Sequence, residues 1–77
     1  MPQTVIKVLK NGQNLSNAKV VLGWDGIVNL GMSQTVYTDK DGLAIIQHSA
    51  TGEASIYING SKMRDTVYTP GSKTVMI

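Results

Sequence analysis

Few residues of this sequence could carry out acid–base or nucleophilic chemistry. His48 is the only histidine among the 77 residues, Ser49 follows it directly, and the chain contains no cysteine. A serine beside a histidine can act as a nucleophile and its base. Neighbouring residues of a β-strand point to opposite faces of the sheet, however, so these two side chains would not converge. We therefore interpret His48 as a surface or partly buried residue and expect no catalytic site and no enzymatic activity.

The possible metal-ligating residues are equally sparse. One histidine and no cysteine provide too few nitrogen or sulfur ligands for a zinc site. The DKDG stretch at residues 39–42 is similar to the beginning of a calcium loop, but an EF-hand loop continues with further oxygen ligands and a late glutamate. Here the strand-like LAII follows at residues 43–46, and Glu53 is the only glutamate. We interpret DKDG as an ordinary turn, with a weak calcium site as the alternative, and expect no metal and no cofactor.

Charge and hydropathy also bear on partners and location. Seven Lys and Arg against five Asp and Glu give a net charge of +2, and the lysines are scattered along the chain. Proteins that bind nucleic acid concentrate positive charge on one face, so we expect no nucleic-acid partner. No run of about 18 apolar residues predicts a membrane span, and the N-terminal residues lack the apolar region of a signal peptide. A cytoplasmic location is the default expectation.

The elements that must position these residues are short strands. Apolar and polar residues alternate between turn signals, and no stretch shows sustained helical periodicity. The predicted strands are residues 4–10, 18–24, 33–38, 43–49, 54–58, 61–69 and 73–77. Asn59-Gly60 is a strong two-residue hairpin signal, which would place Ile56 opposite Met63. The pattern predicts an all-β fold: a small seven-stranded antiparallel sandwich that forms a single domain over residues 1–77.

The segment GWDGIVNLGMSQ, residues 23–34, is unusually apolar for a stretch that contains three glycines. If these glycines interrupt regular strand pairing, the apolar residues between them cannot all face the core. Contiguous apolar patches on small domains often mark partner surfaces, in which Trp and Met are favoured. We therefore predict that another protein binds here, and that the partner-binding residues are Trp24, Ile27, Val28, Leu30 and Met32. The alternative is that Ile27–Leu30 form a further short strand and Trp24 caps the core.

Two other binding modes remain open. The apolar strand at residues 73–77 is a candidate edge strand, which would pair with another chain or give a homodimer. A small-molecule or carbohydrate site is the second possibility, because aromatic rings stack on sugars and tyrosine hydroxyls add hydrogen bonds. The aromatic residues available for it are Trp24, Tyr37, Tyr57 and Tyr68, which are spread over the chain.

Three short motifs follow one another along the chain. A first strand and a glycine-containing turn lead to NLSNAKVVL at residues 14–22. TDKDGLAII follows at residues 38–46, and GEASIYING, an alternating strand between glycines, at residues 52–60. Together these motifs span about residues 4–60, and in this order they resemble carboxypeptidase regulatory-like domains.

The resemblance implies a transthyretin-like (prealbumin-like) Greek-key sandwich, related to Ig-like folds. It implies that Leu15, Ala18, Val20 and Leu22 enter the core from one sheet, and Ala44, Ile46, Ile56 and Ile58 from the other. Such domains are mostly non-catalytic and serve in stability, adhesion or docking. The hydroxyisourate hydrolases of similar fold use several histidines and a C-terminal Tyr-Arg-Gly-Ser motif, which this chain lacks. Invasin-type bacterial Ig-like adhesion modules carry a similar Thr-Asp-x-x-Gly-x-Ala pattern and remain an alternative.

Overall fold

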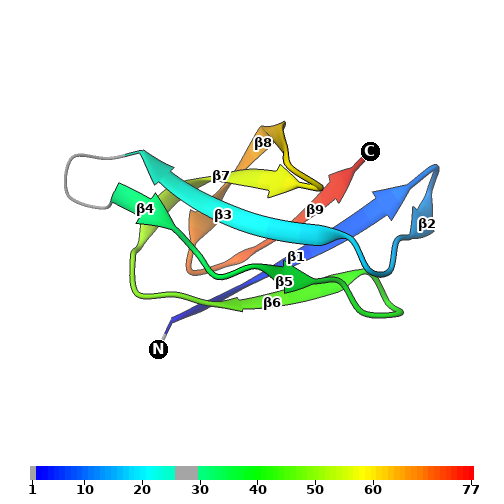
Figure 1. Cartoon of the computed structure of the whole chain (residues 1–77), viewed down its shortest axis with the longest axis horizontal. Helices are drawn as coiled ribbons and strands as arrows, with labels where there is room; N and C mark the ends of the chain where they lie inside the picture. The colour runs from blue at the N-terminus through cyan, green and yellow to red at the C-terminus, as the bar shows by residue number, and fades with distance from the viewer. Residues whose placement is uncertain (1, 26–29) are drawn as a thin grey trace.

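The computed structural model describes residues 2–25 and 30–77, and in this part of the chain the fold is all-β (Figure 1). Among these residues no helix is long and apolar enough to cross a membrane. The strands are β1 (Gln3–Lys10), β2 (Gln13–Asn14), β3 (Lys19–Asp25), β4 (Leu30–Met32), β5 (Val36–Tyr37), β6 (Leu43–Gln47), β7 (Gly52–Ile58), β8 (Ser61–Thr69) and β9 (Ser72–Met76). The seven predicted strands correspond to all of these except the short β2 and β4.

The strands form two sheets that pack face to face. In the four-stranded sheet, β1 pairs with each of the other three strands, β2, β6 and β9. In the five-stranded sheet the order is β4-β3-β7-β8, and β5 pairs with β3 beside β4. The chain therefore crosses between the layers after β2, β5, β6 and β8 (Figure 1).

The prediction of a purely antiparallel fold is wrong for one pair of strands. β9 runs parallel to β1, from the pair Val5↔Ser72 to the pair Leu9↔Met76. The chain leaves the five-stranded sheet after β8, turns at Pro70 and Gly71, and joins the four-stranded sheet along the first strand. Period-2 alternation indicates which face of a strand is buried, but it contains no information about the direction of the neighbouring strand.

The core is built from the inward-facing residues of both sheets. The largest fully buried aliphatic side chains are Ile6, Val8, Val20, Leu22, Ile46, Ile56, Ile58 and Val75. Seven of the eight predicted core residues are buried, and Leu15 packs against them partly buried. Their predicted division between the sheets is wrong for Ile56 and Ile58. Because β7 pairs with β3, these two residues enter the core from the same sheet as Leu22.

The hairpin between β7 and β8 has the predicted turn but a different register. Asn59 and Gly60 both have positive φ, and Ile58 pairs with Ser61 across this two-residue turn. The pairing then shifts, since Tyr57 is opposite Lys62 but Ser55 is opposite Thr66. The additional residues of β8 form a bulge, which removes the predicted pairing of Ile56 with Met63.

Gly42 provides a test of the local backbone geometry of the DKDG turn. Its φ is +76°, and a Cβ there would lie 2.8 Å from the carbonyl oxygen of Val8. Gly12 has a similar φ of +80° but open space around the Cβ position. We expect Gly12→Ala to lower the free energy of unfolding by about 1 kcal/mol through its backbone conformation alone. Gly42→Ala should cost about 1–3 kcal/mol more, because the strand β1 must also move.

Urea unfolding of both variants, followed by tryptophan fluorescence, measures the difference. Equal destabilisation by Gly42→Ala and Gly12→Ala would contradict the close approach of the turn to β1.

Candidate functional site

His48 is buried, which differs from the predicted surface or partly buried position. The residue follows the end of β6, and its backbone N–H donates to the carbonyl of Pro2 at 3.0 Å. Nδ1 lies 2.7 Å from the carbonyl oxygen of Ala50. Since a carbonyl only accepts, Nδ1 carries the proton, and in the neutral ring Nε2 accepts from the Thr4 hydroxyl at 2.7 Å.

A hydroxyl, an imidazole and an orienting oxygen in this order have the connectivity of an activated nucleophile. The hydroxyl of Thr4 is enclosed, however, because Thr4 has no exposed surface. Ser49, the other possible nucleophile, is exposed while His48 is buried. The hydrogen bonds of His48 therefore connect β1 to the segment after β6, and neither hydroxyl is placed to attack a substrate with this imidazole as its base.

Trp24 lies inside the sandwich, although it was predicted to belong to an exposed patch. Its side chain is 4% exposed, and the indole N–H donates to the Thr69 hydroxyl at 3.1 Å. Thr69 in turn donates to the carbonyl of Gly52 at 2.7 Å. The alternation of β3 explains the burial, because Val20, Leu22 and Trp24 share the inward face of this strand.

The other predicted partner-binding residues occupy different positions. Ile27 and Val28 lie outside the described residues. Leu30 begins β4, where it pairs with Asp25. Met32 is 61% exposed and pairs with Gly23 on the outer side of β3, whereas Trp24 faces inward. The structure therefore does not place Trp24 and Met32 on one exposed face, and the patch as a whole stays a prediction.

The DKDG turn uses the carboxylate of Asp39 for its own backbone. Oδ1 of Asp39 accepts from the backbone N–H of Asp41 at 2.9 Å and from that of Leu43 at 3.0 Å. Gly42 donates to the Asp39 carbonyl, which completes the turn before β6. No three His, Asp or Glu residues in the described part of the chain form a group that would hold a metal ion.

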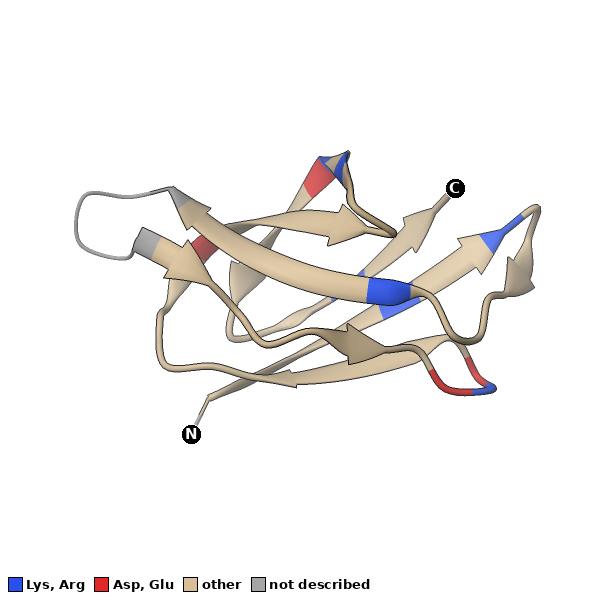
Figure 2. Cartoon of the chain, in the orientation of Figure 1, with Lys and Arg blue, Asp and Glu red and all other residues tan. Residues whose placement is uncertain are grey.

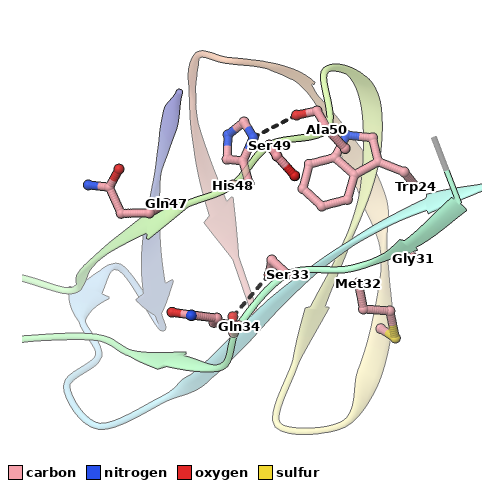
Figure 3. A pocket seen from close by; sticks show the side chains of 9 residues that line it. All are labelled: Trp24, Gly31, Met32, Ser33, Gln34, Gln47, His48, Ser49 and Ala50. Atoms are coloured by element: carbon pink, nitrogen blue, oxygen red, sulfur yellow. Dashed lines mark hydrogen bonds between the residues drawn. The ribbon is translucent and has the colours of Figure 1, made fainter. Parts of the chain in front are cut away.

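A cavity of about 230 Å³ lies between the edges of the two sheets (Figure 3). One wall is formed by residues 31–34 of the five-stranded layer and the other by residues 47–50, which comprise the last residue of β6 and the segment after it. Trp24 and His48 contribute their rings, whose centroids are 5.2 Å apart. Ser33, Gln34, Gln47 and Ser49 add polar groups, and none of the described lining residues is Asp, Glu, Lys or Arg.

The three tyrosines lie on one face, a grouping that sequence reasoning did not establish. Tyr37 on β5 pairs with Lys19, Tyr57 on β7 pairs with Val21, and Tyr68 on β8 pairs with Glu53. Residues that pair across strands share a face, and these partners alternate with the buried residues. All three rings therefore project from the outer side of the five-stranded sheet. We define the tyrosine face as Val21, Met32, Tyr37, Tyr57 and Tyr68.

Gly23 shapes the centre of the tyrosine face. A Cβ on Gly23 would lie 3.0 Å from Cε1 of Tyr57 and 3.7 Å from the terminal methyl of Met32. The tyrosine ring therefore packs against the bare backbone of β3, as aromatic residues do beside a strand glycine. Next to this ring is an open groove of about 350 Å³, which is lined by Lys19, Val21, Met32, Ser33, Thr35, Tyr57 and Gly60.

Substitution of Thr4 tests the role of the buried histidine. Thr4→Val keeps the shape of the side chain but removes the hydroxyl, so Nε2 of His48 loses the hydrogen bond that it makes with Thr4 in the described part of the chain. We expect Thr4→Val to lower the free energy of unfolding by about 1–3 kcal/mol. Thr4→Ser keeps the hydroxyl and is the matched control, with a smaller cost from the lost methyl group.

In the background His48→Phe, the further cost of Thr4→Val should shrink, because the shared hydrogen bond is already absent. Chemical unfolding of the four variants, with circular dichroism as the signal, measures this coupling. Costs that simply add would show that the Thr4–His48 hydrogen bond makes no contribution to stability.

Comparison of the sequence with protein-family models and with curated proteins finds no match to either. The geometry of the buried histidine, the cavity and the tyrosine face is therefore the basis for an assignment of function.

Proposed function

We propose that this chain is a non-enzymatic binding module that recognises another protein through the tyrosine face. The observation that carries the proposal is the projection of all three tyrosines, with Val21 and Met32, from the outer side of one sheet. Tyr37 is 60% exposed and Tyr68 is 77% exposed, so their rings are available to a partner. Tyrosine provides a large contact area at low entropic cost, and Tyr and Met are enriched at interfaces.

The charges beside this face define the chemistry of the partner. Lys62 pairs with Tyr57 on one side, and Lys19 pairs with Tyr37 on the other. Glu53 accepts a hydrogen bond from the Thr66 hydroxyl at 3.1 Å, so part of its negative charge is engaged within the sheet. A folded partner with an apolar centre and acidic residues at its rim would complement the tyrosine face.

For the fold we propose the Greek-key, transthyretin-like arrangement of carboxypeptidase regulatory-like domains. Support comes from contacts between the motifs that carry the resemblance. The hydroxyl of Thr38 accepts from the backbone N–H of Ala18 at 2.9 Å and donates to the carbonyl of Leu15 at 2.6 Å. Thr38 of the second motif thus stabilises the segment of the first. A non-catalytic docking role agrees with what the resemblance implies.

A carbohydrate is the second candidate, and the groove beside Tyr57 favours it. The volume of about 350 Å³ is at the lower end of the range for small-ligand pockets. The ring of Tyr57 offers a stacking surface, while Lys19, Ser33 and Thr35 offer hydrogen-bonding groups around it.

The experiment compares partner binding by tyrosine variants that should remain folded. Proteins retained by the wild-type chain from a lysate of the source organism are identified and purified, and their affinity is measured by calorimetry. We expect Tyr57→Ala and Tyr68→Ala to weaken binding at least tenfold each, since aromatic anchors, whether exposed as Tyr68 or half-buried as Tyr57, dominate interface energetics. Thr74→Ala, at an exposed position in the other sheet, is the control and should leave the affinity unchanged.

The same variants separate the two candidates. Binding of a glycan from an array, lost in Tyr57→Ala but retained in Tyr68→Ala, would replace the protein partner with a sugar in the groove. A purified partner whose affinity is unaffected by both tyrosine variants would exclude the tyrosine face as the recognition surface.

A further inference from the structure

The two sheets expose strand edges, and most of these edges carry features that discourage pairing with another chain. On β9, Lys73 pairs with the buried Ile6, which places a charge on the core side of that edge. β8 is interrupted by the bulge after Lys62 and carries Arg64 and Asp65 there. β4 and β5 contain three and two residues, and residues 33–35 separate them. Short, bulged and charged edges are the usual protections against strand addition.

β6 has none of these protections. Its sequence LAIIQ contains no charge, proline or glycine, and β6 carries no blue or red residue in Figure 2. The strand pairs with β1 on one side and with no strand on the other within the described residues. Ile45 at its centre is 49% exposed on the outer face of the sheet. An uncharged, apolar edge of this kind is a template for pairing with a further strand.

The hydrogen-bond pattern identifies which backbone groups of β6 are free. Val8 donates to the carbonyl of Gly42, and His48 donates to that of Pro2. The backbone N–H and carbonyl groups of the even-numbered residues from 42 to 48 therefore point toward β1. Those of the odd-numbered residues point away from β1. Leu43 bonds to Asp39 through both its N–H and its carbonyl. The N–H and carbonyl groups of Ile45 and Gln47 have no such partner in the described part of the chain.

The cavity described above continues this free edge. Gln47, His48 and Ser49 line it on the side of β6, and Ser33 and Gln34 line the opposite wall. Figure 3 shows these two segments separated, with Trp24 between them at one end. A volume of about 230 Å³ holds one side chain of medium size, and the rings of Trp24 and His48 favour an apolar one.

We propose that the outer edge of β6 binds an extended peptide segment of another protein by strand addition. The segment pairs with the free N–H and carbonyl groups of Ile45 and Gln47. One of its apolar side chains enters the cavity beside Trp24. In such recognition the main chain provides affinity and the pocket provides specificity. The β6 edge belongs to a different sheet from the tyrosine face, and Met32 is the one residue of that face that also lines the cavity. The proposal does not depend on the function proposed for the tyrosine face.

The turn before β6 favours a peptide over a second copy of the chain. Symmetric antiparallel pairing of two β6 strands about Ile45 would set Leu43 against Gln47 of the other copy. The hydrogen bonds of Leu43 to Asp39 already occupy that position. The free backbone groups begin at Ile45 and continue to Gln47, which lines the cavity. This arrangement suits a separate extended segment.

The experiment uses a displayed library of random ten-residue peptides, selected against the full chain and resynthesised. We expect binders with alternating apolar residues, and we expect Ile45→Pro to weaken them at least tenfold. This substitution removes an N–H that faces away from β1, a position at which an edge strand tolerates proline. Ile45→Thr keeps the N–H and is the matched control, with a change of less than threefold. Thermal unfolding of both variants verifies that they are folded.

A second measurement does not rely on any variant of the chain. Binding should slow hydrogen exchange of the Ile45 and Gln47 amides at least tenfold and leave those of Ala44 and Ile46 unchanged. Methylation of alternate backbone nitrogens of the peptide, on the edge that faces β6, should abolish binding. The Tyr57→Ala variant should bind the peptide as the wild type does.

Three results would overturn the proposal. The first is a library that yields no binder. The second is a set of binders that protect other amides and tolerate Ile45→Pro. The third is concentration-dependent protection of Ile45 without peptide, which would assign the edge to a second copy of the chain.

Discussion

The contact between Trp24 and His48 connects the two sheets at one end of the sandwich, and much of the structure depends on it. Trp24 belongs to β3 of the five-stranded sheet, whereas His48 follows β6 of the four-stranded one. The core is otherwise aliphatic, because the chain has no Phe, so the indole is its largest side chain. Each ring is also bound to the layer that it belongs to, Trp24 through Thr69 on β8 and His48 through Thr4 on β1.

This polar network is complete, which is why it is compatible with burial. No buried side-chain nitrogen or oxygen of the described residues lacks a hydrogen-bond partner. Buried polar groups stabilise a fold only when all of them are satisfied, since one unpaired group costs about 1–3 kcal/mol. The inward position of Trp24 also determines the outer surface. Gly23, its neighbour in β3, must face outward, and the ring of Tyr57 packs on the space that this glycine leaves open.

Sequence reasoning predicted the strands, the turns and the buried residues well, because each of these depends on local alternation or on backbone φ. It failed where one strand meets another. Ile56 and Ile58 were assigned to the wrong sheet, and the parallel pairing of β9 was missed, since neither is encoded in a period of two. The exposed patch was predicted from glycines, yet β3 continues regularly through Gly23 and carries Trp24 into the core.

The positions of the tyrosines also depend on strand pairing, which the sequence pattern does not encode. Alternation along the strand places the side chain of Tyr57 on the face opposite to Ile56 and Ile58, so its outward position could be predicted from the sequence. That Tyr37 and Tyr68 share its sheet follows only from the pairing of β5 with β3 and of β8 with β7. A surface formed by several strands therefore becomes visible only when the strand order is known.

The two proposed surfaces differ in what they recognise. The tyrosine face offers side chains from five strands and so selects a partner by shape, apolar contact and charge. The edge of β6 offers backbone groups, which any extended chain can pair with, and selectivity there depends on the cavity.

An exposed apolar edge carries a risk of aggregation that the other edges of this fold avoid through Lys73 and the bulge in β8. Nothing in the packing of the core requires Ile45 to be apolar, since its side chain lies on the outer face beside Val5. An apolar residue at this solvent-facing position, paired with Val5 and next to free backbone groups and a neutral cavity, agrees with the strand addition that we propose for this edge.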